Sequence, residues 1–179
     1  MFALLVAFSW LAMMTVHELG HVLHAWASGG TVTGVVLHPL AISRTDVSPN
    51  PHPQFVAWGG AIWGSLLPLA LWLAMRATAP RYAYVARFFA GFCLLANGLY
   101  LAAGSIEGVG DAGDLLRHGA ARWQLWLFGV PASALGLWLW HGLGPRFTTD
   151  ADHRDERRIT IALALVVAVL VLLGLLLSA

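Results

Sequence analysis

The chain has 179 residues, of which 59% are hydrophobic and only 11% are charged. A soluble domain usually carries about 25% charged residues, so this composition indicates an integral membrane protein. A net charge of +1 gives no sign of nucleic-acid binding, and the single cysteine excludes an internal disulfide and a cysteine-rich metal site. We therefore expect a multi-pass protein of a bacterial inner or plasma membrane, in contact with the lipid bilayer and without a nucleic-acid partner.

Five apolar segments each approach the roughly 20 residues that a helix needs to cross a bilayer. The sequence therefore predicts an all-α polytopic membrane protein of about five transmembrane helices, with a short β-strand or hairpin after the first helix. Residues 1–120 form a three-helix core that includes a strand segment at 29–39. Residues 121–179 add two further helices joined by a charged loop at 143–158. The five predicted spans cover residues 3–27, 54–76, 82–104, 122–142 and 159–178.

The first span ends in His17-Glu18-Leu19-Gly20-His21, an H-E-x-x-H motif. Positions four apart share one helix face, so His17 and His21 can reach one metal ion while Glu18 acts on a water beside it. Ionisable groups inside lipid are costly and usually face a partner or a cavity. His24 lies on the same face, but one straight helix rarely surrounds an ion, so we expect it to support the site or to line a pore. The motif predicts hydrolysis within or at the membrane.

The segment after the first span predicts a change of structure. Gly29-Gly30 is typical of a helix end, and residues 31–37 are rich in β-branched side chains, which favours a strand. Prolines around residues 49–53 interrupt the chain before the second span. That span contains Gly60 and Gly64, a spacing of small residues that allows a neighbouring helix to approach closely.

A zinc hydrolase site has three protein ligands and one open position for water, so a third ligand must come from elsewhere in the chain. The loop after the third span offers Glu107, Asp111 and Asp114. Asp111 could equally be the N-cap of a short helix that ends at Gly119. Asn97 is a polar residue deep in the third span. The local sequence around Asp111 is equally compatible with a metal ligand and with a helix N-cap.

These motifs together resemble the site-2 protease class of intramembrane zinc metallopeptidases over roughly residues 5–120. The H-E-x-x-H sequence matches the first-helix motif of that class, and Trp58-Gly59-Gly60 resembles its glycine-rich second core helix. The Asp111-Ala112-Gly113-Asp114 stretch resembles its Asp-Gly motif, with Ala112 in place of the usual glycine. The resemblance implies that residues 1–120 are a metalloprotease-like core.

The resemblance also implies a site composition. One Zn²⁺ per chain would be held by His17, His21 and Asp111, with Glu18 as the catalytic base. This comparison favours Asp111 over Asp114 as the third ligand. His24, Asp114 and Asn97 are the expected supporting residues or alternative ligands.

The activity implied by the resemblance is hydrolysis of peptide bonds in or near transmembrane segments of a membrane-protein substrate. The predicted strand at 31–37 could pair with an unwound substrate through main-chain hydrogen bonds. The sequence carries no signal for oligomeric state.

Two other functions compete with proteolysis. One is a non-catalytic metal-binding scaffold or partner subunit of a membrane assembly. The other is a membrane di-iron oxidase, which needs about eight histidines in several boxes with His-His pairs. This chain has eight histidines but no adjacent pair. Outside the first span they are isolated in the sequence: His38, His52, His118, His141 and His153.

Overall fold

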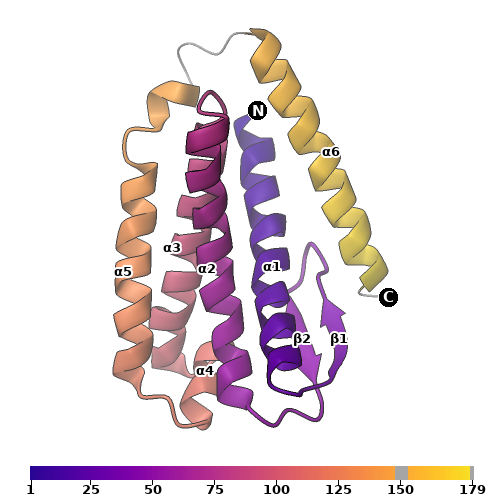
Figure 1. Ribbon diagram of the computed structural model, residues 1–179, viewed down its shortest axis with the longest axis vertical. Helices are drawn as coiled ribbons and strands as arrows, with labels where there is room; N and C mark the ends of the chain where they lie inside the picture. The colour runs from indigo at the N-terminus through magenta and orange to yellow at the C-terminus, as the bar shows by residue number, and fades with distance from the viewer. Residues whose placement is uncertain (148–152, 178–179) are drawn as a thin grey trace.

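The structure, a computed structural model, describes residues 1–147 and 153–177, and its long helices lie side by side along the longest axis of the molecule (Figure 1). Successive long helices run in opposite directions, and a two-stranded hairpin and a short helix lie near one end. The elements in chain order are α1 (Phe2–Ala27), β1 (Val32–Val36), β2 (Arg44–Val47), α2 (Pro53–Thr78), α3 (Ala83–Glu107), α4 (Gly110–Arg117), α5 (Arg122–Trp140), the 3-10 turn η1 (Gly144–Phe147) and α6 (His153–Leu177).

Four helices among the described residues, α1, α2, α3 and α6, are long and apolar enough to cross a membrane. This confirms the prediction of a largely helical, membrane-type fold with a hairpin after the first helix. The remaining predicted span, 122–142, is helical as α5 but does not reach the same apolar character. Its tryptophans and Gln124 explain the difference, because indole rings suit the membrane interface better than the bilayer centre.

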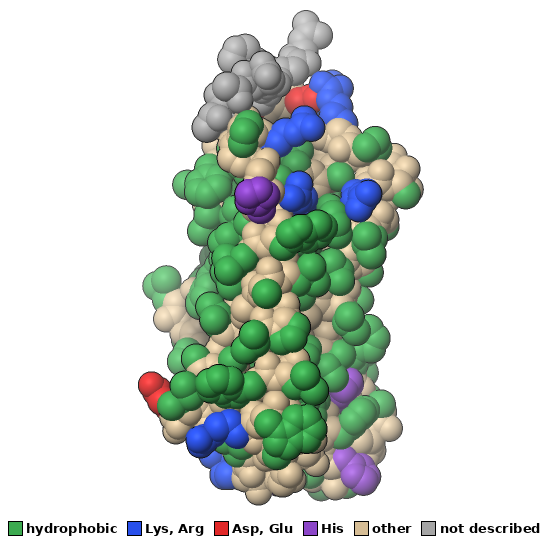
Figure 2. Space-filling model, turned by 90° about the vertical axis from the view of Figure 1, so that its left-hand side faces the viewer, with side chains coloured by type: hydrophobic (Ala, Val, Ile, Leu, Met, Phe, Trp, Pro, Cys, Tyr) green, Lys and Arg blue, Asp and Glu red, His purple; other side chains and the backbone are tan. Residues whose placement is uncertain are grey.

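The surface has the charge distribution that a membrane protein requires. On the face shown in Figure 2, charged side chains gather near the two ends of the molecule, and hydrophobic side chains cover the length between them. α6 contributes strongly to the apolar surface. Its exposed side chains include Leu165, Val169, Leu172 and Leu176.

The predicted charged loop at 143–158 is only partly a loop, because α6 begins at His153 rather than near residue 159. Asp155 and Glu156 lie in the first turn of α6, where carboxylates are favourable beside the positive end of the helix dipole. A cluster of charges was therefore a poor guide to where the helix begins. Residues 148–152 of the predicted loop, and residue 178 of the fifth predicted span, lie outside the described residues.

Glycines bring α1 and α2 into close contact. A methyl group on Gly20 would overlap the backbone of Gly59, and one on Gly59 would overlap the backbone of Gly20. The two helices therefore approach at a point where neither has a side chain, close to the H-E-x-x-H motif. This contact puts the motif against the second helix.

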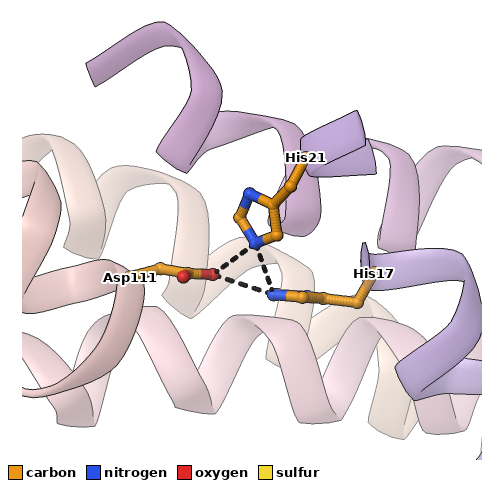
Figure 3. A group of neighbouring side chains, drawn as sticks. All are labelled: His17, His21 and Asp111. Atoms are coloured by element: carbon orange, nitrogen blue, oxygen red, sulfur yellow. Dashed lines mark hydrogen bonds and ion pairs between the residues drawn. The ribbon is translucent and has the colours of Figure 1, made fainter. Parts of the chain in front are cut away.

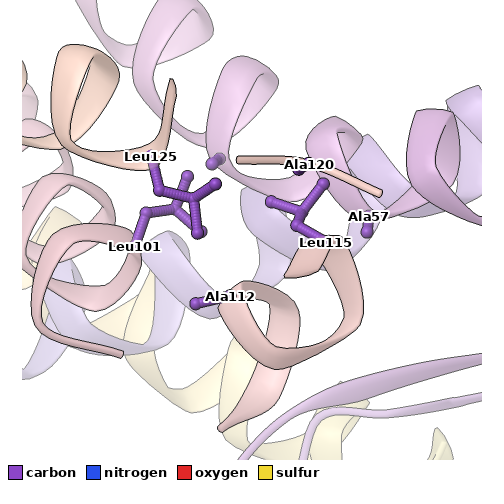
Figure 4. Close-up of a cluster of buried hydrophobic side chains, with 7 residues drawn as sticks. Ala57, Leu101, Ala112, Leu115, Ala120 and Leu125 are labelled. Atoms are coloured by element: carbon purple, nitrogen blue, oxygen red, sulfur yellow. The ribbon is translucent and has the colours of Figure 1, made fainter. Parts of the chain in front are cut away.

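The short helix α4 is held in place by a buried apolar cluster (Figure 4). Leu115 of α4 is fully buried among side chains from the neighbouring helices, including Leu101 of α3 and Leu125 of α5. Burying a leucine side chain away from water stabilises the folded state by about 1.5–3 kcal/mol. The cluster thus fixes the segment that carries Asp111. Its members are Ala57, Ala61, Leu101, Ala112, Leu115, Ala120 and Leu125.

The hairpin pairs β1 with β2 in antiparallel register, with Val35 opposite Thr45 and an irregularity between Val32 and Gly34. Its apolar side lies between α1 and α6, where Leu37 is buried with Leu11 and packs near side chains of α6. Thr45 of β2 reaches α1. The hairpin therefore connects the motif helix to the last helix.

Candidate metal centre

Three metal-ligating side chains from two distant segments converge on one point (Figure 3). The Nε2 atom of His17 lies 2.8 Å from Oδ2 of Asp111. The Nε2 atom of His21 lies 3.2 Å from each of those two atoms. His17 and His21 lie one turn apart on α1, and Asp111 lies in the first turn of α4. Among the described residues this group could hold a metal ion.

The outer nitrogens of both histidines are held by acceptors. The Nδ1–H of His21 donates to the carbonyl oxygen of Val56 over 2.8 Å. The Nδ1–H of His17 donates to Oδ1 of Asn97 over 2.7 Å. Asn97 must present its oxygen there, because its Nδ2 donates to the carbonyl oxygen of Cys93 over 2.8 Å. Metal-binding histidines commonly donate their other N–H in this way, which fixes ring orientation and tautomer.

These hydrogen bonds determine the chemistry of the convergence point. With Nδ1 protonated in each neutral ring, both Nε2 atoms carry lone pairs, and both point toward a carboxylate oxygen. Three acceptors facing one another repel unless a proton or a metal cation lies between them. Ligands of a tetrahedral ion bound at about 2.0–2.1 Å lie about 3.3 Å apart, close to the separations seen here. The donor set therefore fits a bound metal ion.

Asp111 occupies this site as a side chain of the helix and not as its cap. Val109 is the N-cap of α4, so of the two interpretations that the local sequence left open for Asp111, the helix cap is wrong. Burial raises the pKa of the Asp111 carboxyl, whereas a proton on Nε2 of either histidine lowers that pKa well below the usual range through a hydrogen bond and its positive charge. A lowered pKa favours the carboxylate form of Asp111, which is the form that can bind a metal ion.

A glycine of α2 makes room for the two imidazoles. A methyl group on Gly60 would overlap the Nε2 atoms of both His17 and His21. One turn further, a methyl group on Gly64 would come 2.8 Å from Nδ2 of Asn97. The small-residue spacing predicted to bring helices together thus accommodates the polar site itself.

Glu18 lies beside the cluster and is almost completely buried, with 2% of its surface exposed. Its Oε2 accepts a hydrogen bond of 2.7 Å from the hydroxyl of Thr45 in β2. Thr45 thus supplies a partner for a carboxylate that would otherwise be unpaired in an apolar segment. The hydrogen bond also ties the hairpin to the H-E-x-x-H helix.

The site opens into a cavity of about 1250 Å³. His17, Glu18, His21 and Asp111 line it, together with side chains of α3 and much of the segment from Ile42 to Ser48. The three residues of the motif are buried, whereas Asp111 keeps 16% of its side chain exposed. The cavity can therefore bring water and a solute to His17, His21 and Asp111 from the side of Asp111.

The other predicted site residues have separate positions. His24 stacks on Phe55 and its Nδ1–H donates to the Phe55 carbonyl oxygen over 2.6 Å, so it joins α1 to α2 outside the three-ligand group. Asp114 forms an ion pair with Arg117 and lines the cavity without joining the ligands. Glu107 also lines the cavity. The Oδ1 of Asn97 accepts the hydrogen bond from Nδ1 of His17, and Asn97 lies outside the three-residue group.

Three residues at the site were not anticipated from the sequence: Thr45, Val56 and Tyr100. Val56 contributes a backbone carbonyl, for which a sequence has no signal. Thr45 lies in a strand only four residues long that has no clear alternation of apolar residues. Tyr100 could have been noticed as a polar aromatic residue one helical turn after Asn97.

Known proteins give no independent assignment. No protein-family model, curated protein or solved structure matches this chain.

Proposed function

We propose that the protein is a membrane-embedded zinc metallopeptidase, of the kind that its motifs resemble in the site-2 protease class. The observation that carries the proposal is the convergence of His17, His21 and Asp111, with Glu18 buried beside them at a cavity. Two imidazoles and one carboxylate form a ligand set known from catalytic zinc sites, which keep a further position for water.

Within this proposal each residue has a distinct role. His17, His21 and Asp111 would hold Zn²⁺, which lowers the pKa of a bound water and polarises a carbonyl. Glu18 takes a proton from the attacking water and later delivers it to the leaving amine nitrogen. Asn97 and the Val56 carbonyl keep the imidazole lone pairs directed at the site. Thr45 holds Glu18 in place through its hydroxyl.

The cavity supports a peptide substrate rather than a small molecule. Its volume of about 1250 Å³ exceeds the roughly 300–1,000 Å³ of common small-molecule pockets. One wall is the β2 segment, where an extended chain could find main-chain partners. The apolar helices around it favour substrates that are themselves transmembrane segments, which must unwind locally to expose a peptide bond.

The first experiment compares wild type with Glu18→Gln in detergent-purified protein, measuring zinc content and hydrolysis of a model transmembrane peptide. We expect Glu18→Gln to retain one zinc per chain and to lose hydrolysis, because an amide cannot take the proton from water. Hydrolysis at the wild-type rate in Glu18→Gln would overturn the assignment of the base. A wild-type protein that binds zinc but cleaves no transmembrane peptide would favour the non-catalytic scaffold.

The ligand assignment has its own comparison, Asp111→Ala against Asp114→Ala. Only Asp111 contacts the two histidines, so we expect zinc loss in Asp111→Ala and normal zinc in Asp114→Ala. The reverse result would transfer the third ligand to Asp114.

A further inference from the structure

Tyr100 occupies a specific position beside the three metal ligands. Its ring lies edge-on to the imidazole of His17, with 5.9 Å between ring centroids. Its hydroxyl oxygen accepts a hydrogen bond of 3.3 Å from the backbone N–H of Asp111. Tyr100 lines the cavity and keeps 36% of its surface exposed. It therefore contacts two of the three ligand residues and still faces the space where a substrate would lie.

The backbone next to Asp111 is shaped around this hydroxyl. Gly110 has a positive φ of 54°, and a methyl group there would overlap the Tyr100 hydroxyl oxygen. A glycine satisfies both requirements at once, since it tolerates positive φ and has no side chain. The hydroxyl thus has a defined location against the start of α4.

The hydroxyl proton of Tyr100 is available to a substrate. The phenolic oxygen acts as acceptor toward Asp111, and no acceptor for its own proton is found among the described residues. Two other donors close to the candidate ion have acceptors within the protein: one N–H of Asn97 Nδ2 donates to Cys93, and the Thr45 hydroxyl donates to Glu18. Peptide hydrolysis also needs a donor for the oxygen that becomes negatively charged.

We propose that Tyr100 is a further catalytic residue, whose hydroxyl donates a hydrogen bond to the carbonyl oxygen of the scissile peptide bond as negative charge develops there. This inference rests on the proposed peptidase function. As the water oxygen bonds to the carbonyl carbon, Glu18 takes the water proton and the π electrons of the carbonyl move to its oxygen. Tyr100 stabilises that oxygen, keeping its own proton. The carbonyl then re-forms, the C–N bond breaks, and Glu18 returns the proton to the amine nitrogen.

The test is Tyr100→Phe, which removes only the hydroxyl. Removing one oxyanion donor costs about 10²–10³-fold in kcat, and we expect a loss in that range with little change in KM or zinc content. Tyr84→Phe is the matched control, because Tyr84 lies at the other end of α3 against Phe147. Tyr84→Phe should keep wild-type kcat, KM and zinc content.

A binding measurement separates the proposed role of Tyr100 from the proposed peptidase function. A phosphinic peptide mimics the charged tetrahedral oxygen, so zinc-loaded Tyr100→Phe should bind it about 10²–10³-fold more weakly than wild type, in step with kcat. Equal kcat and equal phosphinic-peptide affinity in both proteins would overturn the role of Tyr100 alone. Zinc affinity that falls in parallel with kcat would also overturn it, making Tyr100 a positioning residue for Asp111. A zinc-loaded wild type that neither cleaves nor binds the phosphinic peptide would overturn the peptidase function itself.

Discussion

Helices α2 and α6 both pack against α1, but they do so with different chemistry. The α1–α2 contact is made by glycine backbones, and it encloses the polar side chains of the candidate metal centre. The α1–α6 contact near the hairpin is made by apolar side chains such as Leu11 and Leu170. Within the described residues, the close α1–α2 backbone contact thus surrounds the candidate metal centre, and the α1–α6 side-chain contact holds α6 against α1.

The physical reason is the cost of burying polar groups. A buried polar side chain needs a partner at hydrogen-bonding distance, and that precision requires backbones held at a fixed close separation. Apolar side chains make non-directional contacts and tolerate a shift of one helix against another. We therefore expect substitutions of the same kind to have unequal effects at the two interfaces.

The largest expected effect is that of Gly60→Ala. The added methyl group would overlap the Nε2 atoms of both histidines, so one imidazole must leave its position. We expect loss of bound zinc and of hydrolysis, together with a destabilisation of about 1–3 kcal/mol from overpacking. Zinc content by elemental analysis and thermal unfolding in detergent measure the two consequences.

Gly144→Ala is the matched control for that substitution, because a methyl group on Gly144 meets nothing within 4 Å. It should retain full zinc content. A Gly60→Ala protein with one tightly bound zinc per chain would contradict the view that this glycine creates space for the ligands.

The sequence alone predicted the two histidines of this site, which are close together in the chain. It did not decide the third residue, Asp111, which is far from them in the chain. The pairing of His17 with His21 follows from helical periodicity, because both lie on one stretch of chain. Asp111 is 94 residues from His17, and its local sequence is equally typical of a helix cap. Only the resemblance to a known class favoured it as a ligand. Tertiary packing of α4 on its apolar cluster decides its position.

The same distinction holds for the fold. Length and hydropathy locate the long helices well, since each span depends on its own composition. The beginning of α6 was misplaced because charged residues suit both a loop and the first turn of a helix. The hydrogen bond between Asn97 and His17 could not be predicted. A polar residue in an apolar span indicates that its side chain needs a hydrogen-bond partner, but the sequence does not say which residue that partner is.

A smaller effect is expected at Thr45, which links the hairpin to the metal centre. Thr45→Val removes the hydroxyl that donates to Glu18 but keeps the shape of the side chain. A hydrogen bond to a charged group contributes about 1.5–3 kcal/mol, so we expect kcat to fall by about tenfold or more. Zinc content should stay at one per chain, because Thr45 contacts no ligand.

Thr45→Ser separates the effect of the hydrogen bond to Glu18 from the effect of methyl packing, because serine keeps the hydroxyl and loses the methyl group. It should restore most of kcat. Equal losses in Thr45→Val and Thr45→Ser would show that the methyl contact matters, and that the hairpin acts on Glu18 by packing alone.

The smallest effect at the site is expected for Gly174→Ala, which makes the same chemical change as Gly60→Ala but on α6. A methyl group on Gly174 would overlap the carbonyl oxygen of Leu37, just after β1, so α6 must shift. Near Gly174 the contacts of α6 are made by apolar side chains, and its polar contact at Asp155 lies at the other end of the helix, so this end can move without disturbing the candidate metal centre. We expect unchanged zinc content and kcat, with a lowered melting temperature in detergent. If Gly174→Ala instead lost zinc as Gly60→Ala does, the contrast between the two interfaces would fail. The hairpin would then transmit the position of α6 to the metal ligands.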